Sequence, residues 1–408
     1  MALIVQKFGG SSVRDYERIF HVANIIADTY RKGNDVVVVL SAQGDTTDEL
    51  IKKAEEINPR PSRREMDMLL STGEQISIAL CAMAVEKLGL PVISLTGWQV
   101  NLKTNSDYGS AKIQKLAGER IRAELHRKNI VIVAGFQGIN KFGDITTLGR
   151  GGSDTTAVAL AAALRADLCQ IYTDVEGVFT ADPRTVPNAR KLDEITFDEM
   201  LELASLGAQV LQNRSVELAK RYGVQMEVLS SMEPKRGTIV KEVTTGMEKT
   251  LISGVAKDDN VASVSLIGLE DVPGVAYKIF SVLAKNRINV DIILQSIGRE
   301  STKDITFTVA KKNLERATEI LRGKQSVLMF NDMTTNENLS KVSIVGAGMI
   351  NNPGIASQMF EALYSVGINI HMISTSEMKI SVLIDKSEGD IALKAVHDKF
   401  FGTRSENL

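Results

Sequence analysis

The chain has 408 residues, which is long for a single domain, and its formal net charge of −2 and pI near 6.2 give no electrostatic reason to expect nucleic acid or an anionic membrane as a partner. With 44% hydrophobic and 24% charged residues the composition is that of a globular protein, and no apolar run of about 18 residues is present. Four histidines without metal-type spacing argue against a zinc site. Cys81 and Cys169 lie in apolar stretches, so no disulfide framework is expected and a reducing, cytoplasmic compartment fits best.

The first 245 residues or so alternate short apolar runs with longer amphipathic stretches. Strands are predicted at Leu3–Val5, Val36–Leu40, Val92–Leu95, Ile130–Ala134, Gln170–Thr173 and Met226–Leu229. Helices are predicted at roughly 14–32, 64–88, 109–128, 154–165 and 197–221. This alternation predicts an α/β domain whose mostly parallel sheet lies between helices. Such sheets present ligand sites at the carboxyl ends of their strands, where the polar motifs of this chain fall.

An internal repeat follows a break in the pattern near residues 230–250, where we place a domain boundary. Three pairs of residues recur at an offset of 80 positions: Pro273 and Pro353, Phe280 and Phe360, and Asn289 and Asn369. Each copy predicts a strand, a Pro-Gly turn, a helix and two further strands. The predicted domains are therefore 1–245, 246–335 and 336–408.

Two glycine-containing motifs stand between a strand and a helix. Lys7-Phe-Gly9-Gly10 follows the first strand; its glycines let backbone amides approach an anion, and its lysine supplies a charge for phosphate. Leu148-Gly149-Arg150-Gly151-Gly152-Ser153-Asp154 contains more glycines than a helix cap requires. The alternatives are a tight turn with a surface lysine and a simple N-cap. The second motif in particular favours a binding site.

Three further polar segments are candidates. Thr173–Arg184 and Ser41–Asp48 each follow a strand, and Ser71-Thr-Gly-Glu74 is a small polar break within a helical pattern. A buried Glu74 requires a cationic partner such as a ligand amine. Turns and caps explain each segment alone. Together, the lysine, the arginine, the acidic residues and the glycines form the inventory of a phosphoryl-transfer site, although the P-loop and protein-kinase motifs are absent.

These segments resemble the aspartokinase signature, in the same order along the chain. The matching stretches are Lys7–Ser11, Ser71–Glu74, Thr147–Asp154, Tyr172–Asp174 and Gly177–Pro183. The repeat resembles a tandem pair of ACT domains, the βαββαβ sensors that these kinases carry. The resemblance covers essentially the whole chain. It is closest to the monofunctional aspartokinases, because the chain is too short for a fusion with homoserine dehydrogenase.

The resemblance implies transfer of the γ-phosphoryl group of ATP to the β-carboxylate of L-aspartate, the first step towards lysine, threonine and methionine. It implies that Lys7 neutralises the phosphoryl group, that Asp154 orients Lys7 and the hydrated metal, and that Mg²⁺ is carried on the phosphates rather than in a protein metal site. The implied substrate-binding residues are Ser41, Thr47, Glu74, Arg150 and Ser153, with Arg150 on the α-carboxylate and Glu74 on the α-ammonium. The implied nucleotide-binding residues are Lys7, Phe8, Gly9, Gly10, Thr173, Asp174, Phe179, Thr180, Ala181, Asp182, Pro183 and Arg184.

One position departs from the family pattern. Gln209 stands where many relatives have a lysine that contacts nucleotide, which puts a charged contact there in doubt. Two alternative functions remain open: a non-catalytic amino-acid-binding regulator, and a kinase for another acidic amino acid such as glutamate. Some relatives also make a shorter regulatory subunit from an internal start, and Met247 stands at the predicted boundary.

The resemblance also implies feedback regulation by lysine, alone or with threonine, through ACT modules that pair edge to edge in a homo-oligomer. Asp271 is expected to meet the effector ammonium and Gln295 to offer hydrogen bonds, while the second copy lacks the acidic group. The expected effector-binding residues are Asp271, Gly274, Val275, Ala276, Asn289, Val290, Asp291, Gln295, Ile355, Ala356, Asn369, Ile370 and Ser376. The alternative is that the repeats only dimerise the protein.

Overall fold

The computed structural model describes residues 2–207, 210–233, 235–244, 252–297, 302–349 and 352–402. These residues form two compact units. The first unit holds the chain up to Phe179, Lys191–Ser205 and 210–244; the second holds Thr180–Arg190, Leu206, Gly207 and 252–402. Gln209, Met247 and the predicted boundary at 245/246 lie outside the described residues.

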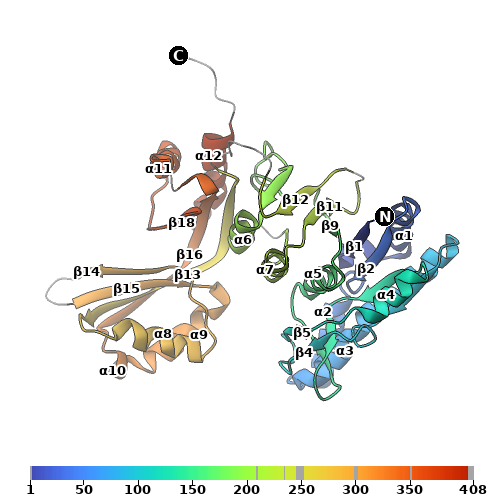
Figure 1. Ribbon diagram of the computed structural model, residues 1–408. Coiled ribbons are helices and arrows are strands. Elements are labelled where there is room, and N and C mark those ends of the chain that lie inside the picture. The colour runs from blue at the N-terminus through green and yellow to red at the C-terminus, as the bar shows by residue number, and fades with distance from the viewer. Residues whose placement is uncertain are drawn as a thin grey trace, which may run out of the picture. The chain divides into compact units, whose positions relative to one another are not determined.

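An eight-stranded sheet forms the centre of the first unit, in the order β10-β12-β11-β9-β1-β2-β6-β3 (Figure 1). All neighbouring strands are parallel except β11 and β12. The strands are β1 (Leu3–Phe8), β2 (Asp35–Leu40), β3 (Val92–Leu95), β6 (Ile130–Ala134), β9 (Leu168–Thr173), β10 (Glu194–Thr196), β11 (Met226–Ser230) and β12 (Thr238–Lys241). Every residue of Val36–Leu40 is fully buried, as expected for a parallel strand covered on both faces. The predicted fold class is confirmed.

Helices cover both faces of this sheet. Val36, Val38 and Leu40 pack in one core with residues of α1 (Tyr16–Arg31) and α3 (Arg63–Lys87). On the other face α5 (Gly152–Leu164) contacts β1, β2 and β9, and α7 (Asn213–Tyr222) packs on α5. The remaining elements are α2 (Thr46–Ile57), α4 (Glu119–His126), α6 (Phe197–Ser205) and a small sheet of β4 (Lys103–Thr104), β5 (Ile113–Lys115), β7 (Gln137–Ile139) and β8 (Ile145–Thr147).

Two helix predictions were wrong in their limits, and one helix was not predicted. The helix expected at 109–128 begins only at Glu119, because Gly118 at its N-cap has a left-handed backbone (φ 72°) that a continuing helix cannot contain. The pattern at 197–221 contains two helices, α6 and α7, and Gly207 between them has φ 109°. No helix was predicted at 46–57, where α2 forms.

Helix α3 is the one helix of the described chain that is long and apolar enough to cross a membrane, judged by length and composition. Of its most apolar 18-residue window, 56% is buried inside the protein. Its buried residues pack against α1 and the sheet, which is the behaviour of a core helix.

The second unit is built on a six-stranded sheet in the order β14-β15-β13-β16-β18-β17. Its elements are β13 (Gly254–Glu270), α8 (Val275–Lys285), β14 (Ile293–Ile297), β15 (Thr302–Val309), α9 (Leu314–Arg322), α10 (Gln325–Leu328), β16 (Asp332–Val345), α11 (Ile355–Ser365), β17 (Met372–Thr375), β18 (Lys379–Asp385) and α12 (Gly389–Phe401). The predicted helix and strands recur in both copies. The long central strands β13 and β16 pair antiparallel from Gly254 opposite Val345 to Ile267 opposite Asp332.

This pairing interleaves the two repeats. Val264 and Leu266 of β13 pack in one core with α8 and α9, whereas Ile252 and Val255 pack in the other with β18, α11 and α12. The start of β13 therefore belongs structurally to the second repeat, unlike the linear division at 335/336. The reason is that antiparallel pairing brings the first residues of β13 beside the last residues of β16.

A segment predicted within the first domain packs in the second unit instead. Ala181 and Val186 are buried in the core of the second repeat, and the Val255 N–H donates to the Thr180 carbonyl (2.7 Å). Thr180 Oγ1 lies 2.9 Å from Nε2 of His397, a fully buried residue of α12. Burial lowers the pKa of His397. Residues 180–190 are thus anchored by the second repeat. The residues on either side of this segment, Phe179 and Lys191, pair with each other.

Candidate active site

A buried ion pair lies at the carboxyl end of β1. Lys7 Nζ is 2.7 Å from Oδ1 of Asp154, the third residue of α5, and the two side chains are only 12% and 11% exposed. β1 and α5 are in direct contact, so the sheet and the helix hold both partners. The N-terminus of a helix also favours negative charge. This end of the sheet therefore combines a fixed cation with backbone donors.

Glu74 contributes a buried acid from α3. Its side chain is 3% exposed; Oε1 accepts the Ala42 N–H (3.2 Å), and Oε2 has no hydrogen-bond partner among the described residues. Burial raises the pKa of Glu74 from 4.5 to about 8. A carboxylate buried in this way is stabilised when a cation lies beside it.

The helical break expected at Ser71–Glu74 is wrong, because α3 runs without interruption through these residues. Gly73 has a packing role instead. A Cβ at this position would lie 2.8 Å from Cβ of Ala42, so glycine allows α3 to approach the segment after β2. That approach brings Glu74 to the site.

The glycine-rich loop before α5 presents Arg150. Gly149 and Gly151 have φ values of 78° and 72°, which glycine adopts without strain. A Cβ on Gly151 would also lie 2.1 Å from Cγ of Gln212. Arg150 itself is exposed, and within the described chain no hydrogen bond or ion pair engages its guanidinium. The loop thus presents a planar cation that is available to a ligand.

These residues line one pocket of about 300 Å³. It contains the two predicted catalytic residues and all five predicted substrate residues, together with Gly9 and Gly10. Sequence reasoning missed Phe136, although its position just after β6 is a signal of the same kind. The complete lining is Lys7, Gly9, Gly10, Ser41, Ala42, Gly44, Thr47, Glu74, Phe136, Gly149, Arg150, Gly151, Gly152, Ser153 and Asp154.

Only three of the predicted nucleotide-binding residues, Lys7, Gly9 and Gly10, line this pocket. The Phe8 side chain is fully buried and stacks on Tyr172 (ring centroids 4.4 Å apart), so its side chain belongs to the core. Thr173 is the last residue of β9, and its hydroxyl donates a hydrogen bond to the carboxylate of Asp174 (3.0 Å). Asp182 and Arg184 form a two-pronged ion pair within the second unit. Within the described chain, none of the residues from Thr173 to Arg184 lines the pocket.

The predicted effector residues surround the two Pro-Gly turns and the edge strand β14. Gly274 and Gly354 (φ 93° and 103°) precede α8 and α11, and the following Val275 and Ile355 are buried. Ala276, Asn289 and Gln295 are exposed, as is Asn369; Val290, Ala356 and Ile370 are partly buried. Both acids of this set have partners in the chain: Asp271 pairs with Lys303 (2.9 Å), and Asp291 pairs with Lys341.

The strand register identifies the residue of the second repeat that corresponds to Gln295. Gln295 lies opposite Ile305 in the first repeat, and Thr375 lies opposite Ile380 in the second. Thr375 is therefore the structural counterpart of Gln295. Ser376 lies beyond the end of β17, where its hydroxyl accepts a hydrogen bond from the Lys379 N–H (3.2 Å).

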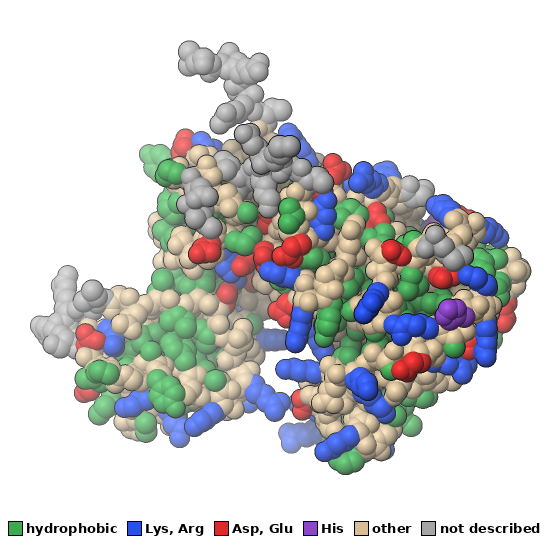
Figure 2. Space-filling model, viewed as in Figure 1, with side chains coloured by type: hydrophobic (Ala, Val, Ile, Leu, Met, Phe, Trp, Pro, Cys, Tyr) green, Lys and Arg blue, Asp and Glu red, His purple; other side chains and the backbone are tan. Residues whose placement is uncertain are grey.

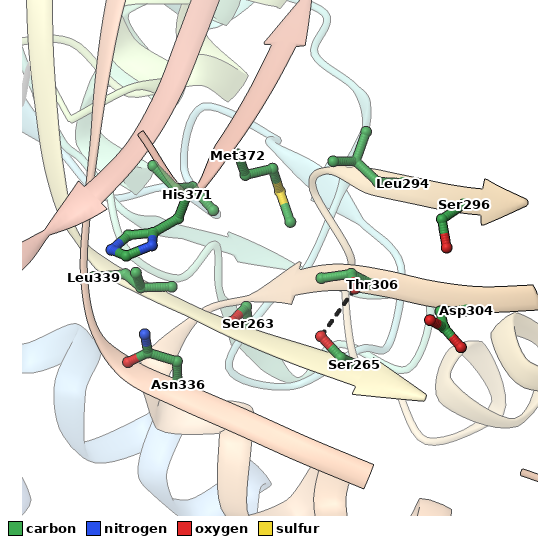
Figure 3. Close-up of a pocket in the computed structure, with 11 residues that line it drawn as sticks. Ser263, Ser265, Leu294, Ser296, Asp304, Thr306, Asn336, Leu339, His371 and Met372 are labelled. Atoms are coloured by element: carbon green, nitrogen blue, oxygen red, sulfur yellow. Dashed lines mark hydrogen bonds between the residues drawn. The ribbon is translucent and has the colours of Figure 1, made fainter. Parts of the chain in front are cut away.

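A second concavity, of about 330 Å³, lies against the six-stranded sheet (Figure 3). Ser263 and Ser265 of β13, Thr306 of β15 and Asn336 of β16 point towards it, and Ser265 is hydrogen bonded to Thr306 (2.9 Å). His371 lies at its other side and is paired with Asp385 (2.9 Å). None of the predicted effector residues lines this concavity.

Comparison with known proteins agrees with this architecture. Residues 2–230 match the amino acid kinase family, and residues 264–325 and 342–400 match the ACT domain. The chain is 51% identical to the aspartokinase of Bacillus sp. (strain MGA3) over 98% of its own length and 97% of the relative. Aspartate kinase from Synechocystis is 47% identical, with a TM-score of 0.55, over 98% of this chain and 69% of that one. E. coli aspartokinase III in complex with aspartate and ADP is 26% identical, with a TM-score of 0.82, over 98% and 100%.

A parallel α/β domain that matches the amino acid kinase family and has a charged pocket at its strand ends, followed by paired ACT repeats, defines a regulated amino acid kinase. Within that class, the chain belongs to the aspartokinase family. Its activity is the ATP-dependent phosphorylation of the β-carboxylate of L-aspartate, under feedback regulation through the ACT repeats.

Proposed function

We propose that the pocket around Lys7 holds aspartate and the γ-phosphoryl group of ATP, with each charged side chain assigned to one charge of the reactants. The observation that carries this proposal is the meeting of three groups in one pocket: a buried lysine, a guanidinium, and a buried carboxyl, where the guanidinium and one carboxyl oxygen have no partner among the residues that the structure describes. The Arg150 fork binds the α-carboxylate of aspartate, and Glu74 accepts the α-ammonium. Ser41, Thr47 and Ser153 form polar walls around the substrate.

The reaction then requires little covalent chemistry from the protein. The β-carboxylate is already ionised at neutral pH, so it attacks the γ-phosphorus without a general base, and the bond to the bridging oxygen breaks as ADP leaves. Lys7 neutralises the phosphoryl oxygens, and Asp154 holds the Lys7 ammonium in place through the 2.7 Å contact. Gly9 and Gly10 leave room for the phosphates beside β1. Thr173, Asp174 and the segment Phe179–Arg184 bind the remainder of the nucleotide.

Magnesium is assigned to the nucleotide rather than to a protein site. The described residues contain no group of three or more His, Cys, Asp or Glu side chains that could hold a metal ion. Asp154 is the acid of the pocket nearest to the phosphate region, and its position beside Lys7 fits a contact with metal-bound water. When bound, Mg²⁺ neutralises phosphate charge; this chain contributes one carboxylate to orient it.

Substrate choice is tested by measuring ADP release with a panel of amino acids. We expect L-aspartate to be phosphorylated with a kcat/KM at least 10-fold above that of L-glutamate. The additional methylene of glutamate moves either its α-carboxylate away from Arg150 or its α-ammonium away from Glu74. Equal rates with glutamate contradict the assignment of the pocket. Loss of ADP release with every amino acid favours a non-catalytic regulator.

The protonation of Glu74 predicts a pH dependence of aspartate binding. Because its pKa is raised to about 8, Glu74 is protonated in the free enzyme at pH 7, whereas pairing with an ammonium requires the carboxylate. The KM for aspartate should therefore fall by up to about tenfold per pH unit as the pH rises towards 8, and level off above it. Glu74→Gln should remove this slope and raise KM; a slope that survives in the variant contradicts the role.

Glu74→Gln, which should weaken aspartate binding, should at the same time stabilise the folded protein. The unfolded carboxyl has its ordinary pKa of 4.5 and the folded one about 8, so the cost of Glu74 is absent below pH 4.5, grows between 4.5 and 8, and is constant above. Glu74→Gln should accordingly raise the melting temperature at pH 8 and leave it unchanged near pH 4.5. The matched control is Glu86→Gln, an exposed position on the same helix.

We further propose that lysine, alone or with threonine, is the effector. E. coli aspartokinase III, a relative at 26% identity, has been solved in complex with lysine and aspartate. The anchoring of Thr180–Arg190 in the core of the second ACT repeat supports a direct route to the nucleotide segment. A ligand that shifts the second repeat displaces residues that also contact nucleotide, and so changes affinity.

A homo-oligomer through the ACT repeats and a cytoplasmic location complete the proposal. The edge strands β14 and β17 expose Ile293, Leu294 and Ile373, and α8 and α11 expose Tyr277 and Tyr364. Figure 2 shows hydrophobic side chains gathered over part of the second unit. Two buried, unpaired cysteines fit a reducing compartment. Mass spectrometry of the natively expressed protein tests whether a shorter subunit begins at Met247.

The regulatory role of Asp271 predicts opposite effects for two variants. Asp271 already holds the Lys303 ammonium, so an effector ammonium must compete with that side chain. Asp271→Ala should raise the lysine concentration for half-inhibition by 10-fold or more, as expected for loss of one charged contact. Lys303→Met should lower that concentration because the competing cation is gone. Both should leave uninhibited turnover near wild type; unchanged inhibition in both variants refutes the assignment.

A further inference from the structure

The loop that presents Arg150 is held on one side by a buried acid outside the pocket. Asp67, on α3, is 1% exposed and accepts three hydrogen bonds. Its Oδ2 receives the N–H groups of Gly109 and Thr147 (both 2.9 Å), and its Oδ1 receives the Thr147 hydroxyl (2.7 Å). Thr147 ends β8 and precedes the glycine-rich loop. Asp67 therefore fixes the point at which the loop begins.

A guanidinium holds the loop from a different helix. Arg214, on α7, donates from Nη1 to the Leu148 carbonyl and from Nη2 to the Ala111 carbonyl, both at 2.8 Å. The Ala111 N–H in turn donates to the Thr147 carbonyl (2.9 Å). One planar group thus bridges two adjacent backbone segments, a geometry that the fork of arginine can satisfy and a lysine ammonium cannot reproduce.

The hydrogen bond from Arg214 to the Leu148 carbonyl lies close enough to Arg150 in the loop to affect its backbone conformation. The Leu148 carbonyl lies one residue before Gly149, whose carbonyl accepts the Gly152 N–H (2.9 Å) at the start of α5. Gly149 and Gly151, on either side of Arg150, lack side chains that would restrict rotation. The backbone of Arg150 therefore depends on the two ends of a short glycine-rich span, and Arg214 holds one of them.

The environment of Arg214 indicates more than general scaffolding. Its guanidinium is partly buried, burial lowers its pKa, and within the described residues its two hydrogen bonds go to carbonyl oxygens rather than to a carboxylate. Burying a cation without an anionic partner is costly. If this position served only for packing, an apolar side chain would be sufficient. The charged guanidinium instead orients two carbonyl groups.

We propose that Arg214 is a positioning residue for aspartate binding, which together with Asp67 preorganises the loop so that the Arg150 guanidinium meets the substrate α-carboxylate. Neither residue lines the pocket. The inference rests on the proposed substrate role of Arg150, and it predicts that disturbing Arg214 changes whichever constant Arg150 controls.

The test is a double-mutant cycle on the full-length enzyme. Arg214→Lys should raise the KM for aspartate about tenfold, the scale of one lost hydrogen bond to a charged group, with the KM for ATP within twofold of wild type. Asp67→Asn, which removes an acceptor on the opposite side of the loop, should change the same constant. Arg221→Lys, at an exposed site on the same helix, is the matched control and should have no effect.

Coupling distinguishes positioning from a structural role. If Arg214 acts through Arg150, the double variant Arg150→Lys/Arg214→Lys should be no worse than Arg150→Lys alone. Additive losses, or a lower melting temperature with both KM values unchanged, overturn the inference. If Arg150→Lys changes the ATP constant instead, the proposed substrate role fails, but the inference survives provided that Arg214→Lys changes that same constant.

Discussion

Lys7→Met should lower kcat by about 10²–10³ while the protein remains folded, because the developing phosphoryl charge loses its cation. The substitution keeps most of the unbranched side chain and leaves Asp154, at 11% side-chain exposure, without the ammonium 2.7 Å away. Loss of that pair costs stability, so the melting temperature should fall as well. The measurement is ADP release at saturating aspartate and ATP, with circular dichroism to confirm folding.

Lys52→Met, at an exposed position of α2, is the matched control for charge and composition. It should keep wild-type turnover. A Lys7→Met enzyme that retains more than about a third of wild-type kcat would show that Lys7 does not stabilise the transition state, since even one lost charge-stabilising donor typically costs far more. Asp154→Asn should give a smaller loss, because the lysine remains but is less well oriented.

Arg150→Lys should raise the KM for aspartate by about 10- to 100-fold and leave the KM for ATP nearly unchanged. An ammonium cannot make the two parallel hydrogen bonds that a guanidinium makes to a carboxylate, and hydrogen bonds to charged groups contribute about 1.5–3 kcal/mol. Because Arg150 is exposed and has no partner among the described residues, the substitution should not affect folding. Initial rates over a grid of both substrates separate the two constants.

Arg60→Lys, at another exposed position of the first unit, is the control for loss of a guanidinium far from the motif in sequence. A change confined to the ATP constant would assign Arg150 to the nucleotide and leave the α-carboxylate without its partner. A fall in kcat with both KM values unchanged would instead give Arg150 a role in the transition state.

The motif residues could be predicted because they lie next to strong local signals. Lys7 lies at the end of one apolar strand, Ser41 follows another, and Arg150 stands among glycines immediately before a helix; the pocket contains all three. Glu74 was identified from its motif, but the motif was wrongly interpreted as a break in the helix. The sequence pattern does not show that Gly73 instead permits close packing of the helix against Ala42. Helix α2 was not predicted, because Ser41–Asp48 was interpreted as a polar segment that could bind a ligand or cap a helix.

The residues that support the site carried no such signal. Asp67 and Arg214 stand within helical patterns where an acid or a base is normally a solvated surface group. Their roles depend on carbonyl and amide groups of the segments at 109–111 and 147–148, which the chain supplies from elsewhere. Likewise, nothing in the sequence indicated that Lys303 forms an ion pair with Asp271.

By itself the sequence determined the kind and order of the elements, the repeat and the charged motifs, because apolar periodicity, glycine turns and short-range spacing are local properties of the chain. Only the tertiary structure decided that Lys7 pairs with Asp154, that the first residues of β13 join the second ACT repeat, and that Thr180–Arg190 is anchored beside His397. These are contacts between segments far apart in the sequence. Their partners are selected by strand register and by the burial of shared surfaces, which no single segment specifies.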